Sequence, residues 1–174
     1  MIKHFFLVLL LFPLLCFSQQ NNFPKSWVGN WKGELQWFSG NTIEPKKVNM
    51  ELHIQPTGSG DNFTWQIIYG KPSEDNRPYV LMPKDTAKGH WVIDENNGIV
   101  LDQYWVAGKL SGAFSLQNSM IINNYWMEDG KLYVEFYNLS IKPVSTSGKG
   151  TDESPAVNSY QVKSYQKAVL QRSQ

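Results

Sequence analysis

The stretch Val48–Ile54 reads VNMELHI and alternates an apolar with a polar residue at every step. The same alternation occurs in WKGELQW at Trp31–Trp37 and in FTWQIIY at Phe63–Tyr69. Successive side chains of a β-strand point to opposite faces, so this alternation predicts strands with one buried and one solvated face. No segment repeats its apolar residues with the 3.6-residue period of a helix. These stretches therefore predict an all-β fold.

Further runs rich in β-branched and aromatic residues follow along the chain. They are Tyr79–Met82, Trp91–Asp94, Ile99–Val106, Leu110–Leu116, Ser119–Met127, Lys131–Ile141 and Ser159–Leu170. The pairs Asn97-Gly98 and Asp129-Gly130 separate runs, and such pairs tolerate the positive φ angles of tight hairpins. Closing a long antiparallel meander removes its exposed edges. We therefore expect an up-and-down antiparallel β-barrel of about 8–10 strands.

The composition excludes several classes of protein. Aromatic residues make up 14% of the 174 residues and charged residues only 18%, which does not fit a disordered tail or a coiled coil. The 16 Lys and Arg residues are nearly balanced by 15 Asp and Glu residues. A protein that binds nucleic acid through charge needs a basic surplus. We therefore expect no nucleic-acid partner.

The amino-terminal residues have the pattern of a secretory signal peptide. Met1–His4 is basic, Phe5–Leu15 is apolar, and small residues precede an expected cleavage site after Ser18. The apolar run is too short for a membrane span of about 20 residues. Lipidation at Cys16 is the alternative, although the residues before it are not the small ones that this modification prefers. We expect a periplasmic or secreted protein with one barrel domain at residues 19–174 and no transmembrane segment.

The residue types needed for metal binding and catalysis are scarce. Cleavage would remove the only Cys, and only His53 and His90 would remain as histidines. A zinc site needs several converging ligands. The chain also lacks Gly-x-Ser-x-Gly, His-Glu-x-x-His, Ser-x-x-Lys and a glycine-rich phosphate loop. We expect no metal, no cofactor and no catalytic residues.

Residues 22–31 read NFPKSWVGNW and lie just before the first expected strand. The Gly29-x-Trp31 pair, preceded by the aromatic Trp27, resembles the opening motif of the lipocalins. The resemblance implies a barrel in which Trp31 plugs the closed end. It also implies a late Arg across that Trp, and Arg172 is the candidate. Cation–π contact of this kind contributes about 0.5–2 kcal/mol.

The match to the lipocalins is incomplete. Pro24 stands where the family has Asp, and the family's Thr-Asp-Tyr motif and disulfide are absent. A more distant calycin barrel of the fatty-acid-binding or nitrobindin-like type is therefore a second interpretation. Nitrobindin-like barrels hold haem through a His near the end of the chain, and His53 and His90 are not there. Haem is not expected.

Alternation also predicts which aromatic residues face the barrel interior. If Trp31 points inward, Trp37 shares its face. By the same reasoning, the expected ligand-binding residues are Trp37, Trp65, Tyr69, Trp105, Trp126 and Phe136. A mostly apolar pocket with a few polar groups is typical of small-molecule sites. The alternative is that these side chains fill the barrel completely.

The sequence thus predicts an extracytoplasmic lipocalin-like protein that binds a small apolar or amphipathic molecule without catalysis. The polar segments Lys71–Arg77 and Pro143–Pro155 are expected to border the mouth of the pocket. The alternative function is a β module that binds a glycan or a protein through exposed aromatic residues. That function requires Tyr104, Tyr133 and Tyr137 to form one surface patch.

Overall fold

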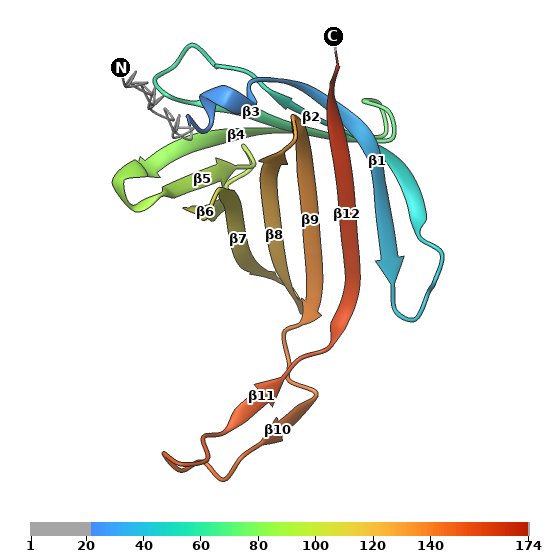
Figure 1. The fold of residues 1–174 in the computed structure, drawn as a ribbon, viewed down its shortest axis with the longest axis vertical. Helices are drawn as coiled ribbons and strands as arrows, with labels where there is room; N and C mark the ends of the chain where they lie inside the picture. The colour runs from blue at the N-terminus through green and yellow to red at the C-terminus, as the bar shows by residue number, and fades with distance from the viewer. Residues whose placement is uncertain (1–21, 174) are drawn as a thin grey trace, which may run out of the picture.

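The computed structural model describes residues 22–173, so the predicted signal peptide and Cys16 lie outside the described residues. The barrel strands are β1 (Gly29–Ser39), β2 (Lys46–Ile54), β3 (Phe63–Tyr69), β4 (Asp75–Asp85), β5 (His90–Asp94), β6 (Val100–Val106), β7 (Lys109–Leu116), β8 (Ser119–Glu128), β9 (Lys131–Ser140) and β12 (Val162–Ser173). They form a closed antiparallel barrel in the order β1-β12-β9-β8-β7-β6-β5-β4-β3-β2 (Figure 1). The predicted all-β barrel is confirmed. No helix in the described range is long and apolar enough to cross a membrane.

Strand β4 is longer than the sequence pattern predicted. It extends over Asp75–Asp85, whereas the pattern predicted only Tyr79–Met82. Pro78 and Pro83 interrupt the run, and proline cannot donate a hydrogen bond to a neighbouring strand. The register between β4 and β5 shifts just after Pro83. The two prolines therefore interrupt the sequence pattern of the strand, although the strand itself continues past both of them.

The polar segment Pro143–Pro155 contains one strand of a second small sheet. Strands β10 (Ser145–Ser147) and β11 (Val157–Ser159) pair antiparallel outside the barrel. The hairpin projects from the end of the barrel where β9 ends and β12 begins (Figure 1). The sequence pattern missed it because each strand is only three exposed residues long and carries no alternation of buried and solvated positions.

The barrel closes between its first and last strands. Trp31 on β1 lies directly opposite Arg172 on β12 and Leu52 on β2. A Cβ atom at Gly33 would fall against the backbone carbonyl of Val169, and it would lie 2.9 Å from the Leu170 side chain. The two strands therefore approach closely at a position that only glycine permits.

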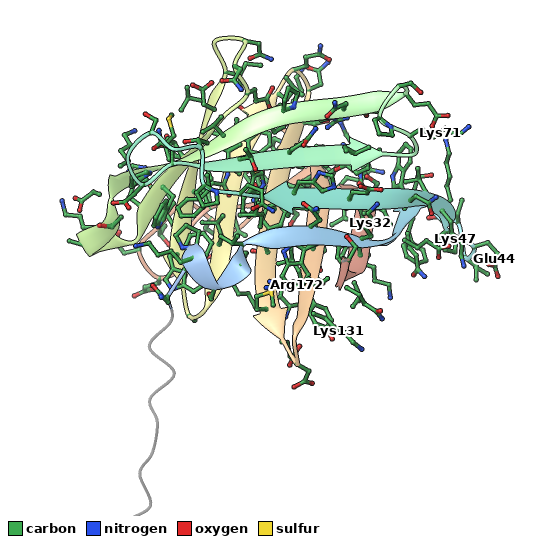
Figure 2. All side chains as sticks on the ribbon, turned by 90° about the horizontal axis from the view of Figure 1, so that it is seen from above. Lys32, Glu44, Lys47, Lys71, Lys131 and Arg172 are labelled. Atoms are coloured by element: carbon green, nitrogen blue, oxygen red, sulfur yellow. The ribbon has the colours of Figure 1, made fainter. Side chains whose placement is uncertain are left out.

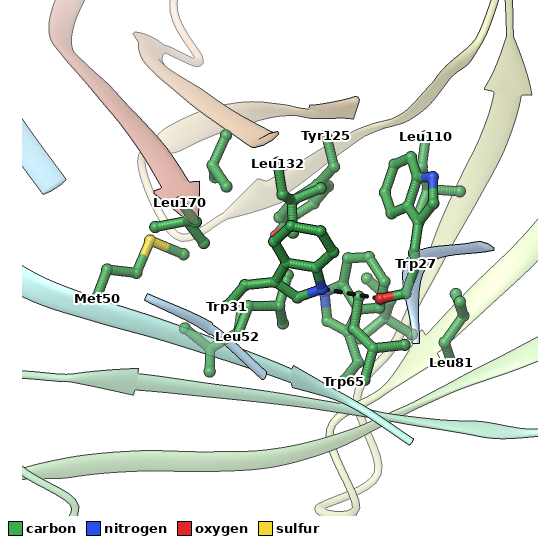
Figure 3. Close-up of a cluster of buried hydrophobic side chains, with 14 of the residues drawn as sticks. Trp27, Trp31, Met50, Leu52, Trp65, Leu81, Leu110, Tyr125, Leu132 and Leu170 are labelled. Atoms are coloured by element: carbon green, nitrogen blue, oxygen red, sulfur yellow. Dashed lines mark hydrogen bonds between the residues drawn. The ribbon is translucent and has the colours of Figure 1, made fainter. Parts of the chain in front are cut away.

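Tryptophans fill one end of the barrel, which we call the closed end. Helix η1 (Lys25–Trp27) brings Trp27 over this end, and the Trp31 Nε1–H donates a hydrogen bond of 2.8 Å to the Trp27 carbonyl oxygen (Figure 3). Trp27, Trp31 and Trp65 are each at most 2% exposed. Phe23 stacks on Trp105 with ring centroids 4.3 Å apart. Aromatic side chains therefore fill the closed end of the barrel.

Arg172 lies over this plug, beside η1 (Figure 2). Its Cζ is 4.7 Å from the centroid of the Trp31 ring, and its Nη2 donates a bond of 3.5 Å to the Ser26 carbonyl oxygen. A Cβ at Gly29 would lie 3.3 Å from the Arg172 guanidinium, so glycine leaves room for this group. The structure thus places Gly29, Trp31 and Arg172 together, as the resemblance implied.

Candidate functional site

The opposite end of the barrel is not filled. Here an inner chamber of about 90 Å³ lies between the middle strands of the barrel. Its apolar wall comes from side chains that include Ile67, Ile93 and Phe136. Its polar wall includes two amides, Gln103 on β6 and Asn123 on β8, which are 0% and 3% exposed. A buried chamber with both kinds of wall is suited to a molecule that is itself amphipathic.

The two buried amides hydrogen-bond to each other. Asn123 Nδ2 donates to Gln103 Oε1 at 2.7 Å, and Gln103 Nε2 donates to Asn123 Oδ1 at 3.5 Å. Gly112 on β7 lies between the two strands and makes this contact fit, because a Cβ there would lie 2.6 Å from Gln103 Oε1 and 2.7 Å from Asn123 Oδ1. A glycine therefore provides the space in which the amide pair lies. We call Gln103 and Asn123 the amide pair.

Three tyrosines line the same chamber. Burial raises the pKa of Tyr69 to about 12. The positive charge of Arg77 lowers this pKa and the negative charge of Asp75 raises it. Burial also raises the pKa of Tyr79 and, more strongly, that of Tyr125. Burial disfavours the phenolate because it loses its hydration. A tyrosine hydroxyl is protonated at pH 7 even without such a shift, so each of the three can donate a hydrogen bond there.

Arg77 and Tyr69 form the threshold between the inner chamber and the mouth. Arg77 Nε and Nη2 donate bonds of 2.9 and 2.8 Å to the two carboxylate oxygens of Asp75. This hydrogen bonding lowers the pKa of Asp75 and raises that of Arg77. The Arg77 Cζ also lies 4.8 Å from the centroid of the Tyr69 ring. The guanidinium is therefore held in place and its charge is already paired.

Two wider chambers share Arg77 and Tyr69 with the inner one. One of about 350 Å³ is lined by residues that include Trp37 and Lys46, and the other, of about 250 Å³, by residues that include Asn138. The three chambers are therefore adjacent, because each is lined by Arg77 and Tyr69. Small-molecule pockets commonly have volumes of about 300–1,000 Å³. The open end is therefore large enough for a small organic molecule.

Two buried polar atoms on this lining lack a hydrogen-bond partner within the described residues. They are Nε1 of Trp65, in the inner chamber, and Oδ1 of Asn138, in the mouth. Most buried polar groups in proteins are paired with protein or with ordered water. A molecule in the chambers that offers an acceptor or a donor would therefore relieve an existing cost.

Four of the six predicted ligand-binding aromatics line these chambers. Trp65 and Phe136 lie in the inner chamber, Tyr69 lines all three, and Trp37 lies at the mouth and is 40% exposed. Trp105 also points inward, but it packs against Phe23 in the closed end, away from the chambers. The inward position of Trp105 therefore serves the plug.

The prediction that Trp126 faces the interior is wrong. Its neighbour Tyr125 is the inward residue, 3% exposed, and Trp126 lies on the outer face of β8. There it stacks on Tyr133 with ring centroids 5.1 Å apart, and Lys109 Nζ lies 4.0 Å from the Trp126 ring. Because β8 carries apolar and polar residues in adjacent pairs, its sequence does not show which alternate set faces inward.

The residues that the sequence reasoning missed are mainly polar. They include the amide pair, Arg77, Tyr79 and Glu95, all of which line the inner chamber. A signal for the amide pair was present, because Gln103 lies between Leu101 and Trp105 on the inward alternation of β6. A polar residue in an otherwise apolar alternation indicates a buried hydrogen-bonding role. The position of Arg77 carried no such signal, since the strand pattern was interrupted by Pro78.

The exposed tyrosines lie on two strands of the outer surface. Tyr133 and Tyr137 share the outer face of β9, against Trp126 and Tyr165, with ring-centroid separations of 5.1 and 4.8 Å. Tyr104 lies on β6, stacked on His90 at 4.6 Å, and β7 and β8 lie between β6 and β9. Glu44, Lys47 and Lys71 also lie on the surface (Figure 2). The patch of three tyrosines that the alternative function requires is therefore divided by two strands.

Both histidines of the described chain are bonded to carboxylates on the outer face. His53 Nε2 lies 2.8 Å from a carboxylate oxygen of Glu51, and His90 Nε2 lies 2.7 Å from one of Asp102. The contact with His90 lowers the pKa of Asp102, and Lys84 acts in the same direction. Within residues 22–173 no three His, Cys, Asp or Glu side chains are grouped as metal ligands. These histidines lie away from the chambers.

The fold and the site define a closed ten-strand antiparallel β-barrel with an aromatic plug at one end and an amphipathic cavity at the other. Neither the known protein-family models nor the curated proteins include a match to the chain. Among solved structures, the chain is similar to a protein of unknown function from Nostoc punctiforme that belongs to the DUF3598 family. The two share 12% sequence identity with a TM-score of 0.59, over 86% of this chain and 48% of that one. This chain thus spans about half the length of that protein, and the likeness concerns the fold alone.

Proposed function

We propose that the protein binds a small amphipathic molecule in the open end of the barrel and performs no chemical step on it. The observation that carries this proposal is the set of adjacent chambers in the open end, which includes Trp37 at the mouth and the buried amide pair. A barrel of about this size can equally be filled by its own side chains. Here the closed end is filled in that way, whereas the open end has both space and polar groups facing it.

One feature supports a place among the calycin barrels, and a second distinguishes the chain from the lipocalins. Gly29 and Trp31 lie beneath Arg172 at the closed end, which is the arrangement that the resemblance to lipocalins implied. The barrel has ten strands, whereas lipocalin barrels have eight. A more distant calycin relative is therefore our proposal, in preference to a lipocalin proper.

The test compares two Phe→Trp variants in a fluorescence titration with N-phenyl-1-naphthylamine, a neutral apolar dye. Phe114 lines the inner chamber and one mouth chamber, so Phe114→Trp should fill space and weaken dye binding at least tenfold. Phe38 lies on the outer face beside Tyr165, so Phe38→Trp should leave binding unchanged. Equal effects of the two variants, or no dye binding by the unaltered protein, would contradict the proposal. If the dye binds as expected, native mass spectrometry of the protein from its own source would give the mass of any natural ligand.

We also propose that the protein acts outside the cytoplasm, which the expected signal peptide supports. Amino-terminal sequencing of the protein from its own source should find Gln19 as the first residue. A first residue at Cys16 carrying a lipid would support the lipoprotein alternative instead. Recovery of the chain with Met1 in the cytoplasmic fraction would contradict both.

A further inference from the structure

The polar groups deep in the inner chamber are all uncharged. The amide pair and the Tyr125 hydroxyl lie there together, and burial keeps the pKa of Tyr125 well above its usual value. An ion placed beside them would lose its hydration and gain no opposite charge. An uncharged polar group would lose far less and would find partners. The deep end of the cavity therefore discriminates by charge.

The charged residues at the threshold do not make the cavity more favourable for an anion. Arg77 is the guanidinium on the chamber lining, and both of its hydrogen bonds to Asp75 are short. Glu95 lines the same chamber and accepts only a bond of 3.3 Å from Asn97. An entering carboxylate would therefore meet one paired cation and an additional carboxylate. Lys46 lies farther out, on the mouth chamber beside Trp37.

The amide pair also has unused hydrogen-bonding capacity. One contact between the two amides is short, at 2.7 Å, and the other is long, at 3.5 Å. Each amide has two N–H donors, so at least one donor of each is left for another acceptor. The Nε1–H of the buried Trp65, which lies close to Tyr125, adds a donor on the same lining. The deep end therefore favours a group that accepts hydrogen bonds.

We propose that the cavity selects uncharged amphipathic molecules whose hydrogen-bond acceptor, such as a carbonyl or hydroxyl oxygen, reaches the amide pair of Gln103 and Asn123. The apolar body of the molecule lies in the mouth chambers, against Phe114, Phe136 and Trp37. This inference rests on the proposed function, and it adds the chemical class of the ligand. Fatty acid anions are discriminated against, because their charge would be buried at the amide pair without a partner. An alkylammonium head could pair with Glu95 at the threshold, but it would then leave the amide pair without an acceptor.

The test is displacement of N-phenyl-1-naphthylamine by three ten-carbon compounds that differ only in their head: decanamide, decanoate and decylammonium. Decanamide should displace half of the dye at a concentration at least tenfold below that of either ion. The double variant Gln103→Leu, Asn123→Leu removes both amides together, so no buried amide is left unpaired. It should still bind the dye but should lose the preference for decanamide. Gln66→Leu, on the outer face of β3, is the matched control and should keep the preference.

The outcomes separate this inference from the proposed function. If the dye binds but decanoate or decylammonium displaces it as well as decanamide does, the selection for neutral heads is refuted and the binding function stands. If neither the dye nor any of the three compounds binds, the binding function fails as well. The ranking on the unaltered protein decides the matter even if the double variant does not fold.

Discussion

Replacing Gly112 with Ala tests whether the amide pair is a fixed part of the cavity. The added Cβ would lie 2.6 Å from Gln103 Oε1 and 2.7 Å from Asn123 Oδ1, closer than unbonded atoms can approach. The amides must move apart, which breaks the 2.7 Å bond between them. Each buried amide that loses its partner costs about 1–3 kcal/mol, so the two together should cost about 2–6 kcal/mol of unfolding free energy.

The loss should be measurable by denaturation, because domains of this size have unfolding free energies of about 5–15 kcal/mol. Urea denaturation followed by tryptophan fluorescence gives the free energy directly, and the melting temperature should fall by about 4–24 °C. Ser115→Ala, on the exposed outer face of the same strand, is the control and should change the stability little. A loss below about 1 kcal/mol for Gly112→Ala would show that the amides move aside freely and are not a fixed part of the cavity.

Three further predictions concern the closure of the barrel, its plug and its tyrosines. Gly33→Ala should cost about 3 kcal/mol in urea denaturation, because its Cβ meets the Val169 backbone carbonyl, which cannot rotate away; a neutral result would contradict the close approach. Arg172→Met should cost about 1 kcal/mol in the same assay by removing the cation over Trp31, and a more stable variant would count against that contact. Burial raises the pKa of Tyr69 to about 12, so the folded protein keeps a proton that the unfolded chain loses near pH 10. Stability should therefore fall between about pH 10 and pH 12, and Tyr69→Phe should make that fall shallower in melting temperatures measured against pH.

The strands could be predicted because their alternation is a local property. Phe63–Tyr69 is predicted and observed with the same limits, and the predicted Val48–Ile54 lies within β2. The pairing of first and last strands followed from closing the meander, and it brings Trp31 opposite Arg172. What failed locally was Asp75–Asp85, where prolines interrupt the pattern, and the short hairpin strands β10 and β11.

The candidate site could be predicted only in part, because a cavity depends on where strands from the whole chain meet. Trp65 and Tyr69 follow from alternation within one strand. The contact between Gln103 and Asn123 does not, since 20 residues and a third strand separate them. Their meeting depends on the register of three neighbouring strands and on the absence of a side chain at Gly112.

The all-β barrel could be predicted from local patterns, since alternation and turn residues act over a few positions. The resemblance carried by Gly29-x-Trp31 led to Trp31, which lies at the closed end together with Trp27 and Trp65. Which end of the barrel is filled, and which is open, depends on how all ten strands come together. The inward position of Tyr125, in place of Trp126, depends on them in the same way. The physical reason is that a one-residue change of phase reverses every side chain of a strand, and pairing with both neighbours fixes that phase.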